Sequence, residues 1–140
     1  MPVKDVARTE VVTAASDQTA GNLATLMKEE NVGCVVIEAD DEPIGIVTDR
    51  DLVVTVLESR SKPSEVLAGE IMTESPVTVD VDTGILQATE AMYDASVRRM
   101  PIVDENGQVA GIITMDDLLV LLTDELDNLA SIAEAESPPY

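Results

Sequence analysis

The sequence lacks histidine, tryptophan and phenylalanine, and it contains a single cysteine, Cys34. With one thiol no intramolecular disulfide can form, and without histidine neither a zinc cluster nor a histidine general base can be built. Basic residues are also scarce, since eight lysines and arginines stand against 28 acids, a formal net charge of −20. Because a field of that sign repels phosphate backbones and anionic lipids, we expect neither a nucleic acid nor a membrane as partner.

Long apolar segments are absent as well. The longest purely aliphatic run, residues 118–122, is far short of the roughly 20 residues that a membrane span needs. Charged residues within the first ten positions exclude a secretory signal. The remaining expectation is a cytoplasmic protein, and 140 residues with 45% hydrophobic content suit one compact unit or two very small domains.

The acidic residues are spread over every segment of the chain. Residues 1–69 carry 13 acidic and six basic residues, and residues 70–140 carry 15 and two. Scattered acids with few lysines are typical of a protein adapted to high salt. An ordinary acidic protein is the alternative, because scattered charge mainly sets solubility and self-repulsion.

The chain contains two copies of one unit. Val12-Thr13 recurs as Val77-Thr78, an offset of 65 residues, and Gly45–Thr48 recurs as Gly111–Thr114 at an offset of 66. One residue inserted near position 106 accounts for the change. Because a repeated unit builds a repeated structure, the two halves should fold alike.

Each copy has the same pattern of apolar and turn residues. A short strand, at 11–13 or 77–79, precedes a helix, and two apolar strands follow, joined by acidic turns at 40–43 and 104–107. A second helix ends the unit. The prediction is an α/β (α+β) fold of two pseudo-symmetric repeats, each strand-helix-strand-strand-helix, packed through their sheets.

Turn-forming and apolar residues indicate where the units end. We assign residues 1–62 to the first repeat, 63–69 to a linker, 70–135 to the second repeat with a C-terminal helix, and 136–140 to a tail. Apolar residues at helical spacing continue along that last helix: Leu118, Leu122, Leu126, Leu129 and Ile132. We expect this stripe to be core, with coverage of a dimer interface as the alternative.

A seven-residue motif occurs at 45–51 and again at 111–117: glycine, two aliphatic residues, threonine, two variable residues and aspartate. It is typical of a buried strand that turns into a helix, where a threonine hydroxyl lies beside free backbone N–H groups and can meet a phosphate. The aspartate, Asp51 or Asp117, can accept two hydrogen bonds from the vicinal hydroxyls of a ribose.

The same motif also has an interpretation without a ligand. A threonine followed three residues later by an acid is an N-capping arrangement. Duplication in one context favours the ligand, because both copies also share the start of the preceding strand, Val32-Gly33-Cys34 and Val97-Arg98-Arg99.

These motifs, with Ile-Met-Thr at 71–73 and Val-Arg-Arg-Met-Pro-Ile-Val-Asp at 97–104, resemble the CBS domain family in its tandem form, the Bateman module. The resemblance covers about residues 3–125 and extends to stand-alone proteins of halophilic archaea. It implies energy-sensing or related regulation, with two pseudo-twofold half-sites that each hold an adenosine ligand such as AMP, ADP, ATP or S-adenosylmethionine.

Carried over residue by residue, the resemblance implies one site with Thr114 at phosphate and Asp117 at ribose. Arg98 and Arg99 would supply positive charge there, and Gln18 of the first repeat would lie across the cleft. We expect this to be the better-equipped site.

The symmetric site would use Thr48, Asp51 and Arg50, with Thr83 from the second repeat. Gly33-Cys34 stands where the other site has two arginines, so weaker phosphate binding is expected.

The resemblance further implies ligand contacts at Met100 and Pro101. Without tryptophan or phenylalanine, adenine would lie against aliphatic side chains: Val12, Ile37, Ile46, Val77 and Ile112.

The resulting prediction is a non-catalytic regulatory module that senses an adenosine nucleotide and transmits its occupancy to an effector protein. It needs no obligatory cofactor or metal and forms a homodimer. The alternative is a constitutive dimerisation or scaffold protein with vestigial pockets. An enzyme is disfavoured, because threonine and aspartate alone offer no activated nucleophile or tuned base.

Overall fold

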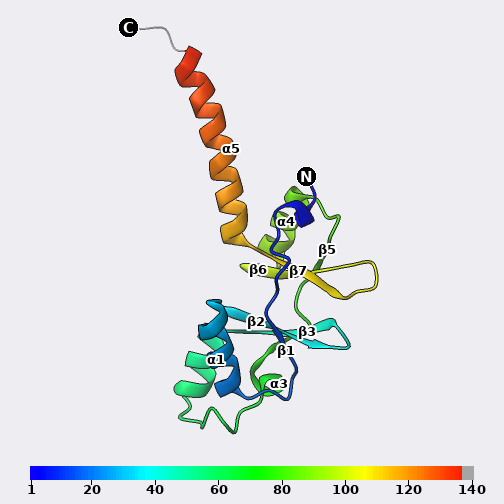
Figure 1. The fold of residues 1–140 in the computed structure, drawn as a ribbon, viewed down its shortest axis with the longest axis vertical. Coiled ribbons are helices and arrows are strands. Elements are labelled where there is room, and N and C mark those ends of the chain that lie inside the picture. Colours follow the sequence, from blue (N-terminus) through cyan, green and yellow to red (C-terminus); the bar gives the residue numbers. More distant parts are fainter. Residues whose placement is uncertain (137–140) are drawn as a thin grey trace.

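The structure, a computed structural model, describes residues 1–136 and contains two β-sheets that face each other, with helices on their outer sides (Figure 1). The first repeat comprises β1 (Thr13–Ala14), α1 (Ala20–Glu30), β2 (Cys34–Ala39), β3 (Glu42–Thr48), α2 (Asp49–Asp51) and a π-helix, η2 (Leu52–Leu57). The second comprises β5 (Val79–Asp80), α4 (Ile85–Ala95), β6 (Arg99–Val103), β7 (Val109–Thr114) and α5 (Met115–Glu136).

This order confirms the predicted strand-helix-strand-strand-helix unit in both copies. The helices α1 and α4 begin 65 residues apart, and Thr48 and Thr114 end the last strands 66 residues apart. The short first strands lie one to two residues later than predicted, because backbone pairing with β2 and β6, which sequence periodicity does not report, sets their limits.

Strand pairing is the same in the two sheets. A parallel pair (β1 with β2, β5 with β6) is followed by an antiparallel one (β2 with β3, β6 with β7). Each antiparallel pair contains an irregularity at an equivalent place, after Ile37 and after Ile102. The duplicated sequence therefore encodes a duplicated backbone.

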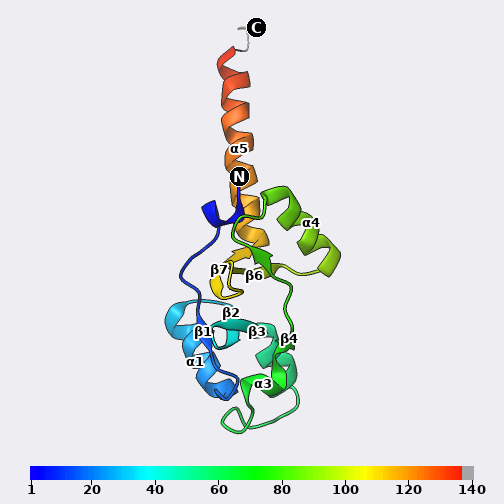
Figure 2. The ribbon, with the colours of Figure 1, turned by 90° about the vertical axis from the view of Figure 1, so that its right-hand side faces the viewer.

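Alternating strand residues divide each sheet between two packing layers. Val35 and Ile37 belong to the core beneath α1, and Met100 and Ile102 belong to the core beneath α4. Residues on the opposite faces of the strands are buried between the two sheets: Val36, Ile46, Pro101 and Ile112. The repeats therefore pack through their sheets, as predicted (Figure 2).

The first eight residues pack on the second repeat. Val3, in the short 3₁₀ helix η1 (Val3–Asp5), is fully buried in the second core, and its N–H donates to the Thr83 carbonyl at 2.7 Å. Arg8 and Ile112 exchange backbone hydrogen bonds of 3.0 and 2.9 Å. Lys4 Nζ contacts Asp82 at 2.6 Å, a hydrogen bond that raises the pKa of Lys4.

The corresponding segment of the second copy packs on the first repeat. It forms α3 (Ala68–Ile71) and β4 (Thr73–Glu74), with Ala68 buried in the first core and Thr73 paired with Ile46 of β3. Each leading segment thus crosses to the other sheet. The predicted boundaries follow the chain, whereas the packing crosses the linker at 63–69 in both directions.

This exchange explains the glycine of the duplicated motif. A Cβ at Gly111 would lie 2.8 Å from the Arg8 carbonyl oxygen, and one at Gly45 would overlap the Met72 side chain. Glycine is required because the crossing segment approaches the backbone too closely for any side chain.

The C-terminal helix α5 leaves the body of the molecule (Figure 1). Of the predicted apolar stripe only Leu118 is buried, at 4% exposure. The remaining members are 46 to 67% exposed: Leu122, Leu126, Leu129 and Ile132. The expectation that this stripe is core is therefore wrong beyond Leu118, because no other element reaches along the helix. The predicted tail at 137–140 lies outside the described residues.

Within residues 1–136, no helix combines the length and the apolar character needed to cross a bilayer.

Candidate functional site

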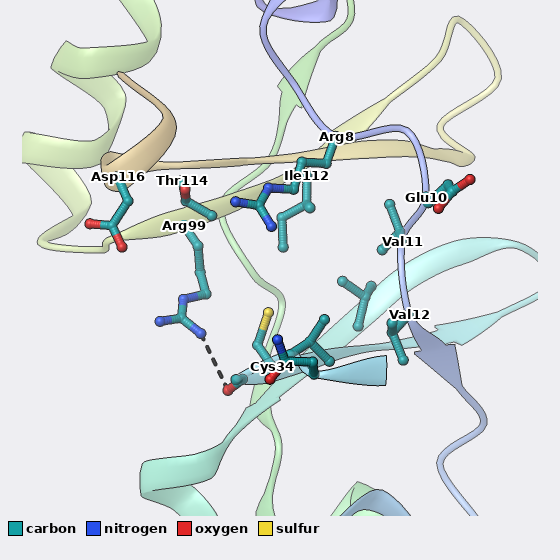
Figure 3. A pocket seen from close by; sticks show the side chains of 13 residues that line it. Arg8, Glu10, Val11, Val12, Cys34, Arg99, Ile112, Thr114 and Asp116 are labelled. Atoms are coloured by element: carbon teal, nitrogen blue, oxygen red, sulfur yellow. Dashed lines mark hydrogen bonds between the residues drawn. The ribbon is translucent and has the colours of Figure 1, made fainter. Parts of the chain in front are cut away.

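Two pockets lie between the sheets and are built from equivalent parts of the chain. One, named here the Arg8 pocket, is lined by residues 8–12 of the leading segment, by residues 31–34 before and at the start of β2, and by Thr114 and Asp116 (Figure 3). Val36 and Ile112 add apolar surface from the two sheets.

The second, named the Arg50 pocket, has the corresponding composition. Its lining includes Thr73, residues 75–77, residues 97–99 at the start of β6, and Thr48 to Arg50 at the end of β3. Each pocket thus joins the strand start of one repeat to the strand end of the other.

Equivalent positions in the two pockets differ in charge. Glu10 corresponds to Ser75, and Asp116 corresponds to Arg50. Gly33 corresponds to Arg98, so the arginine of one repeat faces a position without a side chain in the other. The backbone symmetry is therefore not a chemical symmetry.

In the Arg8 pocket the charges balance. Arg8 and Arg99 stand beside Glu10 and Asp116. Arg8 Nε donates to Asp117 Oδ1 at 3.2 Å, and Arg99 Nη1 donates to the Gly33 carbonyl at 3.4 Å (Figure 3). Both guanidinium groups are already held by the protein.

The Arg50 pocket carries an excess of positive charge. Arg50, Arg98 and Arg99 line it together with one acid, Asp49. Counting both pockets, half of the chain's eight basic residues line the cleft of a protein with net charge −20. Such a concentration of cations is suited to an anionic ligand.

Both aspartates of the duplicated motif cap the helix that follows. Asp51 Oδ2 accepts from Thr48 N at 2.8 Å, and Asp51 N donates to Thr48 Oγ1 at 3.2 Å. Asp117 Oδ2 accepts from both Thr114 N (3.1 Å) and Thr114 Oγ1 (2.7 Å). The capping alternative is thus present in the structure, although each carboxylate keeps lone pairs that could accept a hydroxyl. Neither aspartate lines a pocket, and their role at ribose stays a prediction.

One predicted pairing is wrong. Arg98 lines the Arg50 pocket with Thr48, and it does not join Thr114. Arg99 lines both pockets. The reason is that successive side chains of an extended segment point to opposite sides, so two adjacent arginines diverge.

Four other predicted contacts lie outside both pockets. Gln18 is in the turn before α1, where its Oε1 accepts from Asn22, and Thr83 is in the turn before α4. Met100 is fully buried in the second core, and Pro101 is fully buried in β6. The turns lie at the ends of the helices away from the cleft, and strand residues 100 and 101 have no surface left for a ligand.

The predicted aliphatic surroundings of adenine divide between the pockets. Val12 and Ile112 line the Arg8 pocket, and Ile46 and Val77 line the Arg50 pocket. Ile37 lies in the first core instead, because it points toward α1.

Sequence reasoning missed several lining residues, above all Arg8 and Asp116. A signal for them existed. Position 8 precedes Thr73 by the repeat offset of 65, and position 116 follows Arg50 by 66, so extending the repeat comparison into the leading segment would have found both.

Residues 3–58 and 68–124 each match the CBS domain family. The chain is 45% identical over 118 residues to an uncharacterized protein of Methanopyrus kandleri (84% of this chain, 60% of that protein's length). It is also 32% identical over 118 residues to the CBS domain-containing protein YhcV of Bacillus subtilis, covering 84% of this chain and 83% of that protein. The chain therefore belongs to the CBS domain family, as a tandem pair.

A solved CBS domain pair in complex with 5′-methylthioadenosine and S-adenosyl-L-methionine superposes with a TM-score of 0.78 at 25% identity, covering 89% of this chain and 98% of that chain. CBS pairs as a class are regulatory nucleotide-binding modules. Adaptation of this chain to high salt stays a prediction.

Proposed function

We propose that this chain is a regulatory module, without catalytic activity of its own, that binds an adenosine-type nucleotide between its repeats and transmits the occupancy to a partner protein. The observation that carries the proposal is the gathering of four arginines on two pockets of a strongly acidic chain: Arg8, Arg50, Arg98 and Arg99. Arginine matches phosphate in geometry as well as in charge.

The Arg50 pocket is the proposed site for a nucleotide that carries phosphates. Three arginines oppose one carboxylate there, so an anion gains attraction without displacing an internal ion pair. Ile46, Val77 and Val97 supply an apolar wall against which adenine can pack. This reverses the ranking of the two sites made from the sequence, which rested on the incorrect pairing of Arg98 with Thr114.

The Arg8 pocket is the proposed site for an adenosine ligand with little negative charge. Its two arginines are matched by two acids, and Arg8 is engaged by Asp117. Val12, Val36 and Ile112 provide the apolar surface. The solved CBS pair with two different adenosine ligands supports the idea that one pair can hold ligands of different charge.

A calorimetric titration of ATP, AMP, 5′-methylthioadenosine and S-adenosylmethionine at high salt tests this proposal. We expect ATP to bind with a stoichiometry of one and to be lost in Arg98→Gln, and the less charged ligands to bind that variant unchanged. Arg60→Gln is the matched control, because Arg60 lines neither pocket.

A constitutive scaffold is the second candidate, and the complete capping hydrogen bonds of Asp51 and Asp117 favour it. Absence of binding for all four ligands, with a melting curve typical of a folded protein, would establish that candidate instead.

A further inference from the structure

The projecting part of α5 exposes a row of leucines. The helix has 22 residues and is therefore about 33 Å long. Leu119, Leu122, Leu126 and Leu129 are 51, 46, 67 and 64% exposed. We call these four residues the α5 seam. It is an uncovered apolar surface on a chain that is otherwise strongly acidic.

The spacing of the α5 seam is that of a coiled coil. Its members are separated by three, four and three residues, so Leu119 and Leu126 take the heptad position a, and Leu122 and Leu129 take position d. A strict a/d row forms a narrow apolar line that two helices can share.

The acidic residues of α5 lie away from the seam. Asp124 takes position f, and Asp127 and Glu134 take position b, on the far side of the helix. Glu125, at g, is the one charged residue of this helix next to the seam between Leu119 and Leu129. A second helix could therefore approach without burying carboxylates.

The surface area of the chain leaves room for such an interface. The accessible surface is 9006 Å² for 14.9 kDa, whereas a compact monomer of that mass exposes about 7,000 Å². The excess is larger than the roughly 800 Å² that each partner contributes to a standard interface.

A groove at the base of α5 continues the seam toward the body. Leu119 and Leu122 line it from α5, and Met92 and Tyr93 line it from α4. Tyr93 is 84% exposed although its ring is large and apolar. A helix lying on the seam would cover this groove with the same face.

We propose that the α5 seam binds a second copy of itself, so that two chains pair through their C-terminal helices in parallel. The partner is another copy of this chain because the seam is self-complementary, with leucine at both a and d. This inference does not depend on the nucleotide proposal.

The charge at position g selects the parallel orientation. In a parallel pair Glu125 lies opposite Ala130 of the other copy, whereas an antiparallel pair centred on the seam places Glu125 beside its own copy. Like charges at that position would repel, so the parallel arrangement is favoured.

Sedimentation equilibrium of the full chain tests the pairing. We expect a dimer whose dissociation constant rises at least tenfold in Leu126→Gln/Leu129→Gln, with helical circular dichroism kept, because both side chains are exposed. The matched control is Val53→Gln/Leu57→Gln, two exposed apolar residues of η2 at 55 and 71% exposure. A monomeric parent, or a dimer lost only in the η2 control, would overturn the proposal.

Oxidative cross-linking tests the orientation, in a Cys34→Ser background. Parallel pairing brings the two copies of position 129 together at a distance a disulfide can span, so Leu129→Cys should cross-link and Asp127→Cys should not. Cross-linking that requires Leu119→Cys together with Leu129→Cys would show antiparallel pairing and overturn the parallel assignment.

Discussion

The two pockets have nearly the same backbone and different chemistry. Each joins a leading segment, a strand start and a strand end taken from both repeats, at residues offset by 65 or 66. Yet Asp116 stands where the other pocket has Arg50, and Gly33 stands where it has Arg98. Duplication has kept the frame, which depends on buried residues and glycine, while exposed side chains in the cleft have been free to diverge.

Arg99 belongs to both pockets and links them. Its guanidinium reaches the Gly33 carbonyl of the Arg8 pocket, and the residue also lines the Arg50 pocket. A phosphate in the Arg50 pocket would therefore compete with the Arg8 pocket for one cation.

The largest effect is expected from removing both arginines of the β6 start. Hydrogen bonds to charged groups contribute about 1.5–3 kcal/mol each, so Arg98→Gln/Arg99→Gln should weaken ATP binding at least a hundredfold, roughly 3 kcal/mol. Calorimetry should show a smaller change for 5′-methylthioadenosine. An equal loss for both ligands would mean that the pockets do not differ in their use of charge.

Removing the two motif aspartates compares the pockets at ribose. Asp51→Ala should weaken ATP about ten- to a hundredfold, and Asp117→Ala should weaken only the less charged ligand. Each variant also loses its helix cap, which costs about 0.5–2 kcal/mol of stability, so melting curves should fall alike. If both variants melt lower but bind as the parent does, the aspartates act only as caps.

Exchanging charges should convert one pocket toward the other. In Glu10→Ser/Asp116→Arg the Arg8 pocket acquires the residues of its counterpart, and its affinity for ATP should rise about tenfold, the equivalent of one hydrogen bond to a charged group. A stoichiometry for ATP that changes from one to two is the readout. Arg50→Asp is the reverse experiment and should lower ATP affinity in the Arg50 pocket.

The smallest effect concerns salt, and it should have opposite signs for folding and for ATP. Screening shortens from about 10 Å at 0.1 M to about 3 Å at 1 M, which relieves the self-repulsion of a chain of net charge −20. We expect the melting temperature to rise by about 4 °C per kcal/mol of relieved repulsion between 0.1 and 1 M KCl.

Over the same range ATP binding in the Arg50 pocket should weaken, while binding of 5′-methylthioadenosine in the Arg8 pocket should stay constant. A flat melting profile would remove the salt adaptation without affecting the fold.

Much of the fold could be predicted because it depends on local and periodic signals. The repeat offset, the alternating strands and the helix that begins after Thr48 or Thr114 are all readable along the chain, and the structure contains them. The site was predicted less well. The two threonines and the cleft arginines were identified, but Arg8 was missed and Arg98 was placed with the wrong threonine.

The sequence by itself determined the duplicated unit, the capped threonine at each strand end and the scarcity of cations that makes four clustered arginines meaningful. Only the tertiary structure decided which arginine meets which threonine, because the pairing depends on two sheets packing face to face. It also decided that Val3 and Ala68 fill the cores of the opposite repeats. Burial of those residues is a long-range event, and no periodicity along the chain records it.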